Sequence, residues 1–195
     1  MDPDLRFFRF EPALAQGSAQ FGHIVGFDKM YLLRKGAPVG DAFPADATYV
    51  MSDDAPDDLV VEDAISTLDS ELVVSPGARA VLAPLVGDAV EWLEVGVVNH
   101  KGRREPGPYA IANALRLVDA VDRDASVFMA NPLMPDRMMN VTELAVDEGR
   151  IPDDAVLFRL AGLAQVLGVR RDVTEAVRDA GLTGFDFLPF TSFRG

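Results

Sequence analysis

The sequence predicts an α+β fold, a single domain in which a mixed sheet carries two strand–helix–strand units. Three observations support this prediction. The chain has 195 residues, of which 49% are hydrophobic and 25% charged, and this suits a globular domain with one core. Two segments, 78–93 and 173–188, share one hydrophobic pattern and match without a gap after a shift of 95 residues. No low-complexity linker divides residues 1–195.

The N-terminal part of the chain is predicted to contain short strands and long loops. Residues 5–10, LRFFRF, predict a strand, and residues 24–33 have strand-like and aromatic residues that Gly26 interrupts. Gly, Pro and Asp dominate residues 36–58, which indicates loops with a short strand at 48–51. We expect a helix over 57–67.

The first strand–helix–strand unit has the clearest helix signals. An apolar run at 72–74 precedes Ser75 and Pro76, a typical N-cap followed by a first-turn proline. Gly87 ends the predicted helix, and residues 90–98 predict a strand. One apolar helical face is formed by Ala78, Val81, Leu82 and Leu85.

The second unit repeats this order near the C-terminus. An apolar run at 166–169 comes before the helix, Gly181 ends it, and residues 185–190 predict a strand. The helical face is formed by Val173, Ala176, Val177 and Ala180. We expect both helices to pack on the same sheet, over a core that includes Trp92, Leu93, Phe185, Phe187 and Leu188.

The segment between the two units is less decisive. Residues 109–121 are compatible with a buried strand or a helix, because periodicity does not separate the two. Residues 141–146 predict a strand, 151–154 a turn or short helix, and 157–160 a further apolar strand.

Negative charge is concentrated in one part of the chain. The formal net charge is −13, and no Lys, Arg or His occurs between Lys35 and Arg79. Ten acidic residues lie in that interval: Asp41, Asp46, Asp53, Asp54, Asp57, Asp58, Glu62, Asp63, Asp69 and Glu71. The net negative charge argues against nucleic acid as a direct ligand. The acidic stretch is either a solvated face or a surface for a basic partner.

Composition also bears on the cellular compartment. The N-terminal sequence MDPDLRFFRFEP predicts no secretory leader, and no apolar run reaches the length of a membrane helix. The chain has no cysteine, which excludes disulfides and thiolate zinc sites. We therefore expect a cytoplasmic protein that binds no membrane.

Three aspartates, Asp119, Asp122 and Asp124, form the most conspicuous polar cluster. A calcium-binding EF-hand loop that began at Asp122 would require glycine at its sixth position and glutamate at its twelfth, where Val127 and Leu133 stand. A carboxylate metal pair remains an alternative. Aspartates at such positions more often cap helices or close turns.

Catalytic motifs are missing from the sequence. The two histidines, His23 and His100, belong to no H-E-x-x-H motif, and neither a G-x-S-x-G elbow nor a phosphate-binding glycine loop is present. Without cysteine, a Cys–His nucleophile is impossible. The sequence therefore offers no positive case for an enzyme and indicates no cofactor.

Three motifs in a shared order resemble a known family. Tyr109, Asn113, Arg116, Asp119 and Asp122 match a Tyr-rich strand followed by N-x-x-R-x-x-D-x-x-D. An Ile151-Pro152 turn leads to the strand-like segment 158–162, and 180–187 match an Ala-Gly-Leu-Thr-Gly turn with an aromatic strand. This pattern resembles immunity protein family eleven of bacterial polymorphic toxin systems. It covers about 71–190, and residues 1–70 form a variable acidic part; at 168–170 the chain departs from the family's usual apolar residues and serine cap.

The resemblance implies a non-catalytic protein that binds and neutralises a co-encoded bacterial toxin. It gives Asp119 and Asp122 a structural role, pairing with Arg116 or Arg123 or capping backbone amides. The alternatives are a scaffold or regulatory binding module without a toxin, and a metal-dependent enzyme that uses the aspartate cluster. If the toxin is basic, the expected partner-binding residues are the densest acids: Asp53, Asp54, Asp57, Asp58, Glu62 and Asp63.

Overall fold

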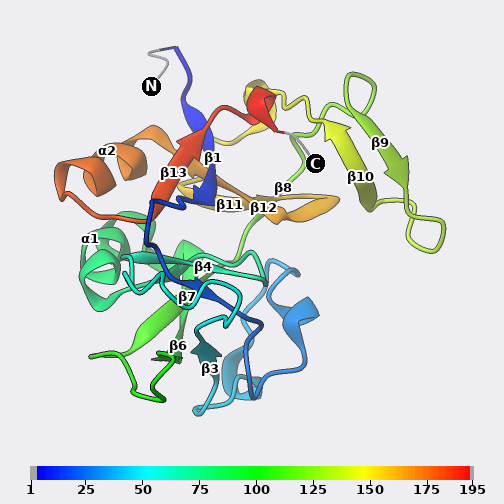
Figure 1. Cartoon of the computed structure of the whole chain (residues 1–195). Coiled ribbons are helices and arrows are strands. Elements are labelled where there is room, and N and C mark those ends of the chain that lie inside the picture. The colour runs from blue at the N-terminus through cyan, green and yellow to red at the C-terminus, as the bar shows by residue number, and fades with distance from the viewer. Residues whose placement is uncertain (1–3, 194–195) are drawn as a thin grey trace.

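The computed structural model describes residues 4–193 and confirms an α+β fold (Figure 1). Within these residues there are two α-helices and thirteen β-strands. The strands form a six-stranded sheet, a five-stranded sheet and a separate two-stranded hairpin. Five short 3-10 helices lie at Met30–Leu32, Gly40–Ala42, Gly87–Ala89, Glu148–Arg150 and Phe190–Ser192.

The six-stranded sheet combines strands from the first two thirds of the chain. Its spatial order is β2 (Gln20–Phe21), β4 (Ala64–Thr67), β5 (Val73–Val74), β7 (Tyr109–Ala114), β6 (Val90–Val98) and β3 (Thr48–Val50). Every residue of β7 is buried, so the ambiguous apolar segment begins as a central strand.

The five-stranded sheet joins the N-terminal strand to the C-terminal half. Its order is β13 (Phe185–Leu188), β1 (Phe7–Pro12), β12 (Leu163–Arg170), β11 (Leu157–Leu160) and β8 (Leu117–Val118). The two-stranded sheet pairs β9 (Val127–Ala130) with β10 (Met138–Glu143), and it projects from the body of the molecule (Figure 1).

The first strand–helix–strand unit consists of β5, α1 (Pro76–Val86) and β6. Ser75 caps the helix, because its Oγ accepts a hydrogen bond from the Ala78 amide at 3.1 Å. Both β5 and β6 pair antiparallel with β7, which lies between them, so they run parallel to each other.

The second unit has the same arrangement and consists of β12, α2 (Arg171–Asp179) and β13, with β1 between the two strands. Arg170 stands at the N-cap of α2 and makes no side-chain cap, as its departure from the family pattern suggests. Gly168 is needed in β12, because a Cβ there would lie 2.3 Å from the Phe158 ring. The two predicted units are therefore present, each split by one antiparallel strand.

The prediction that both helices pack on one sheet is wrong. Helix α1 contacts β5 and β7 of the six-stranded sheet, whereas α2 contacts β12 of the five-stranded sheet. The helices also contact each other, and both lie on the same side of the molecule, one beside each sheet (Figure 1). Each helix covers its own sheet. One core cluster contains residues from both helices and from strands of both sheets.

The predicted core residues are only partly buried. Leu93 is buried, but Trp92, Phe185, Phe187 and Leu188 are half-buried. Strand β13 is at the edge of its sheet, which leaves one side of its aromatic residues accessible. The Trp92 ring lies under the Arg79 guanidinium, at 5.5 Å from the ring centroid.

Three local predictions also need correction. Residues 57–63 have no helix and lead into strand β4, because Ala64 and Ile65 pair with β5. Residues 24–33 contain an isolated bridge and a 3-10 turn instead of a strand, since Gly26 adopts a φ of +91° that interrupts extended backbone. The strand predicted at 141–146 begins earlier, at Met138.

Candidate functional site

The aspartate cluster does not converge on a common point. Asp119 and Asp124 are exposed, and Asp122 is half-buried. The Asp122 Oδ1 accepts hydrogen bonds from the amides of Asp124 and Ala125, both at 3.1 Å, which closes a turn. Asp122 therefore has the backbone-capping role expected of it.

The neighbouring arginines have other partners. Arg116 pairs with Asp154 at 2.9 Å, and Arg123 donates to the carbonyls of Pro135 and Asp136. Of the two structural roles expected for these aspartates, the described residues show backbone capping, at Asp122, and not pairing with Arg116 or Arg123. Across residues 4–193, no group of three or more His, Asp or Glu side chains could hold a metal ion.

The six densest acids divide into two sets. Asp53, Asp54 and Asp57 are exposed and Asp58 is half-buried, in the loop between β3 and β4. Within this loop Asp54 accepts from the Ser52 hydroxyl at 3.1 Å, and Asp53 lies 3.3 Å from His100 Nδ1. These four side chains form what we call the acidic loop, and they leave most of their oxygen atoms to solvent.

Glu62 and Asp63 turn inward. Glu62 is buried and accepts from the Ser18 hydroxyl at 2.5 Å. Asp63 accepts from the Ser75 hydroxyl at 2.6 Å and from the Thr183 amide at 3.1 Å. Asp63 thus connects the start of α1 to the turn before β13, and both carboxylates support the base of the acidic loop.

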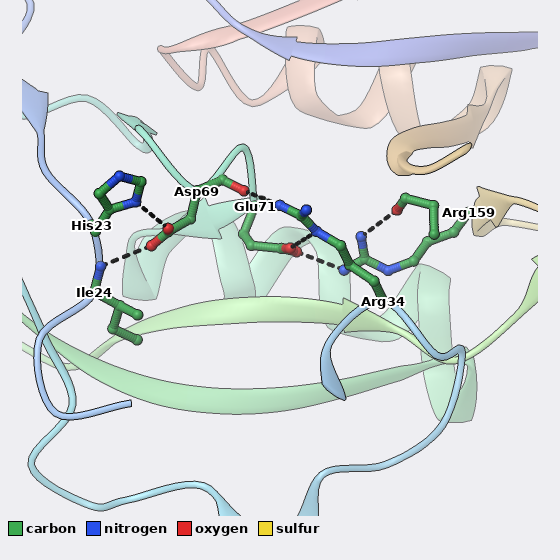
Figure 2. Close-up of polar contacts among 7 residues, drawn as sticks. His23, Ile24, Arg34, Asp69, Glu71 and Arg159 are labelled. Atoms are coloured by element: carbon green, nitrogen blue, oxygen red, sulfur yellow. Dashed lines mark hydrogen bonds and ion pairs between the residues drawn. The ribbon is translucent and has the colours of Figure 1, made fainter. Parts of the chain in front are cut away.

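Two more acids of the same stretch, Glu71 and Asp69, are buried inside the protein. Glu71 and Arg159 form an ion pair at 2.6 Å, and both side chains are fully buried (Figure 2). Arg159 also donates to the Ala164 carbonyl at 2.8 Å, and Arg34 approaches the second Glu71 oxygen at 3.5 Å. This pair joins the β4–β5 turn of one sheet to β11 of the other.

Asp69 extends this polar network toward the surface. Its two oxygens contact the Ile24 amide at 2.8 Å and His23 Nδ1 at 2.6 Å, and its carbonyl accepts from Arg34 at 2.9 Å (Figure 2). Burial raises the pKa of the nearby Tyr49 hydroxyl, and the negative charges of Asp69 and Glu71 raise it further. Since every carboxylate here accepts from a protein donor, the network is suited to holding loops in place.

Arg34 also lines a cleft of about 570 Å³ on the other side of this network. The cleft lies between the loop after the first 3-10 helix, the β11–β12 turn and the β9–β10 hairpin. Its cations are Arg34, Lys35 and Arg137, and none of its lining residues carries a carboxylate. A cationic cleft is unexpected in a chain with a net charge of −13.

The chain matches the model of the Immunity protein family (Imm11) over residues 6–192. This chain belongs to the Imm11 family. The match covers almost the whole of this family member and includes the N-terminal residues, which the short sequence motifs did not connect to the family. No curated protein is significantly similar to it.

The motif residue Asn113 of this Imm11 member has a structural position. Asn113 is fully buried in β7, and its amide donates to Glu91 at 2.9 Å and to the Ala37 carbonyl at 3.3 Å. Glu91 in turn accepts from the amides of Val39 and Gly40. The motif therefore attaches the loop 36–40 to the six-stranded sheet. Neither helix of the described residues is long and apolar enough to cross a membrane.

Sequence reasoning missed the cationic cleft and the hairpin beside it. A compositional signal was available, because four of the seven methionines fall at Met129, Met134, Met138 and Met139. Met-rich segments are common at adaptable binding surfaces. The cleft itself could not be seen, since its cations are about 100 positions apart in the chain.

Proposed function

We propose that this immunity protein neutralises a cognate bacterial toxin by binding it, without catalysis. The observation that carries the proposal is the family match over residues 6–192. The encounter takes place in the bacterial cytoplasm, a reducing compartment with which a chain without cysteine is compatible. The toxin is encoded beside this chain as part of a polymorphic toxin system.

The geometry supports binding by a preformed surface. Several polar side chains that could have served catalysis are engaged in the fold: Asp122 closes a turn, Asp69 holds Ile24, and Glu71 pairs with Arg159. A scaffold ordered in this way binds with a small loss of conformational entropy. The protein's surface, and not a reactive centre, then decides its activity.

The acidic loop is part of the surface that meets the toxin. Asp53, Asp54, Asp57 and Asp58 lie together in one connection, and no base occurs from 36 to 78. Such a concentration of charge attracts a basic toxin and accelerates the encounter. Glu62 and Asp63 hold the loop in position through their hydrogen bonds to Ser18 and Ser75.

The deciding experiment is co-expression of this chain with the product of the neighbouring toxin gene. We expect the two to co-purify, and we expect the chain to restore growth to cells that express the toxin. The control is a chain with Leu82→Asp, which places a charge in the buried face of α1 and prevents folding. Growth rescue without a complex, or a complex without rescue, would contradict neutralisation by binding.

A further inference from the structure

The β9–β10 hairpin exposes an unusual amount of apolar surface. Of thirteen large hydrophobic residues exposed in the described chain, five are in this hairpin: Val127, Met129, Leu133, Met134 and Met139. Leu133 at the tip has 88% of its surface exposed. Concentrated apolar exposure of this kind marks interaction sites.

Three of these side chains, Val127, Met129 and Met139, share one face of the hairpin, and Leu133 and Met134 lie in the turn that connects its strands. Met129 and Met139 are cross-strand partners, so their side chains point the same way, and Val127 precedes Met129 by two residues on the same strand. Met138 points to the opposite side and is buried. The hairpin therefore covers the protein with one face and presents the other, rich in methionine, to solvent.

The fold holds the hairpin tip in a defined position. Asn131 Oδ1 accepts from the amides of Leu133 at 2.9 Å and Met134 at 3.0 Å, which orders the turn. The Met138 amide donates to the Gly162 carbonyl at 2.9 Å, and Arg123 donates to two carbonyls of the tip. An apolar tip built in this way is preorganised for a partner.

The cationic cleft adjoins this face. Met139 and Arg137 belong to both the hairpin and the cleft, and Leu117 contributes an exposed apolar wall. Arg137 is exposed with no carboxylate within salt-bridge distance in the described structure, and Lys35 lies 4.9 Å from the Tyr31 ring centroid. Arg34 already contacts Glu71, so the surplus positive charge comes from Lys35 and Arg137.

We propose that this hairpin and cleft anchor the toxin, and that they receive a segment with a carboxylate flanked by apolar side chains. The carboxylate enters the cleft beside Arg137 and Lys35, while the apolar side chains cover Leu133, Met134 and Met139. This inference rests on the proposed function and adds a second face to it. The acidic loop governs the encounter, and the apolar hairpin governs how long the complex lasts.

The test compares single variants in the purified complex with the neighbouring gene product, by biolayer interferometry. Leu133→Ser and Arg137→Glu should each raise the dissociation rate about tenfold or more. Matched controls are Leu68→Ser, at an exposed leucine in the turn after β4, and Arg178→Glu, at the end of α2. The controls should stay within about twofold of the wild type, and circular dichroism should show that all four variants fold.

The outcomes separate this inference from the proposed function. If the wild-type chain does not bind the neighbouring gene product, the proposed function fails. If the wild type binds and both hairpin variants dissociate at the wild-type rate, only the present inference is overturned. Sedimentation of the free chain provides a second criterion. If the free chain is a dimer and Leu133→Ser makes it a monomer, the hairpin face binds a second copy of the chain, and the present inference is overturned as well.

Discussion

Glu71 and Arg159 are a charged pair in the interior, between the β4–β5 turn and β11. Their side chains are fully buried, so each charge has lost its hydration and depends on the other. Asp63 makes a similar connection at the other end, from α1 to Thr183. At the scale of residues, single side chains thus add polar connections between elements of the two sheets.

Replacing Glu71 with Gln should therefore be strongly destabilising. The substitution leaves the Arg159 charge buried without its partner, and such losses cost about 3–5 kcal/mol of unfolding free energy. The control is Asp154→Asn, which removes an exposed pair with Arg116 and should cost about 1 kcal/mol or less. Urea denaturation measures both, and equal losses in the two variants would contradict the role of the buried pair.

Tyr109 gives the protein a dependence on alkaline pH. Burial, reinforced by Glu105 and Asp63, raises the pKa of Tyr109 to about 12 from its ordinary value of 10.0. Between these values the folded chain keeps a proton that the unfolded chain has lost, so stability is retained below the lower pKa and falls as pH rises. The decline approaches about 1.4 kcal/mol per pH unit for one such group.

Tyr109→Phe should therefore reduce the slope of unfolding free energy against pH in that alkaline window. Urea denaturation of both proteins across the window measures the slope, and the same comparison at neutral pH corrects for any change in packing. Identical alkaline slopes in the two proteins would show that Tyr109 ionises with its ordinary pKa in the fold.

At the scale of elements, the start of helix α1 is set by two hydrogen bonds of Ser75 and by the proline that follows it. Ser75 Oγ accepts from Ala78, donates to Asp63, and stands directly before Pro76. Helix α2 begins at Arg171, its N-cap Arg170 makes no side-chain cap, and the helix depends on the Val173, Thr174 and Val177 face that it buries. The two units thus share one topology and differ in how the helix is started.

Ser75→Ala should lower the unfolding free energy by about 1–3 kcal/mol, the sum of a lost cap and a lost hydrogen bond to Asp63. Ser52→Ala, in the acidic loop region, is the control and should have little effect, because its hydroxyl bonds only to the neighbouring Asp54. Thermal unfolding followed by circular dichroism compares the two. A Ser75→Ala protein as stable as the control would mean that packing alone sets the helix start.

For the whole molecule, charge is distributed unevenly. The acidic loop and the cationic cleft are formed by different parts of the chain, and they have opposite signs. The net charge of −13 makes the long-range electric field of the protein negative. A basic partner is therefore attracted from every direction.

Changing Asp53, Asp54, Asp57 and Asp58 together to Asn should slow association with the toxin about tenfold or more at low salt and flatten its salt dependence. The dissociation rate should change little. A second quadruple variant, with Asn at the exposed Asp88, Asp119, Asp124 and Asp179, alters net charge equally and is the control. Stopped-flow measurements at two salt concentrations compare them, and equal rates for the two variants would leave the acidic loop as a solvated face.

The sequence by itself determined the fold class, the two strand–helix–strand units and the family. These features rest on local signals: the Ser75-Pro76 cap, the period of the apolar residues in both helices, and short motifs around Asn113 and Pro152. Local signals can be read from the sequence because residues that are close together in the chain create them. They failed at residues 57–63, where the chain lacks a helix and the following strand depends on pairing with β5.

Only the tertiary structure decided which charges are buried and which are available. Asp57 and Glu71 belong to one acidic stretch, yet one faces solvent and the other pairs with Arg159, 88 positions away. The cationic cleft likewise joins Lys35 to Arg137. The physical reason is that burial and long-range pairing depend on how sheets and loops meet in space, and the free energy of a charge depends on that environment.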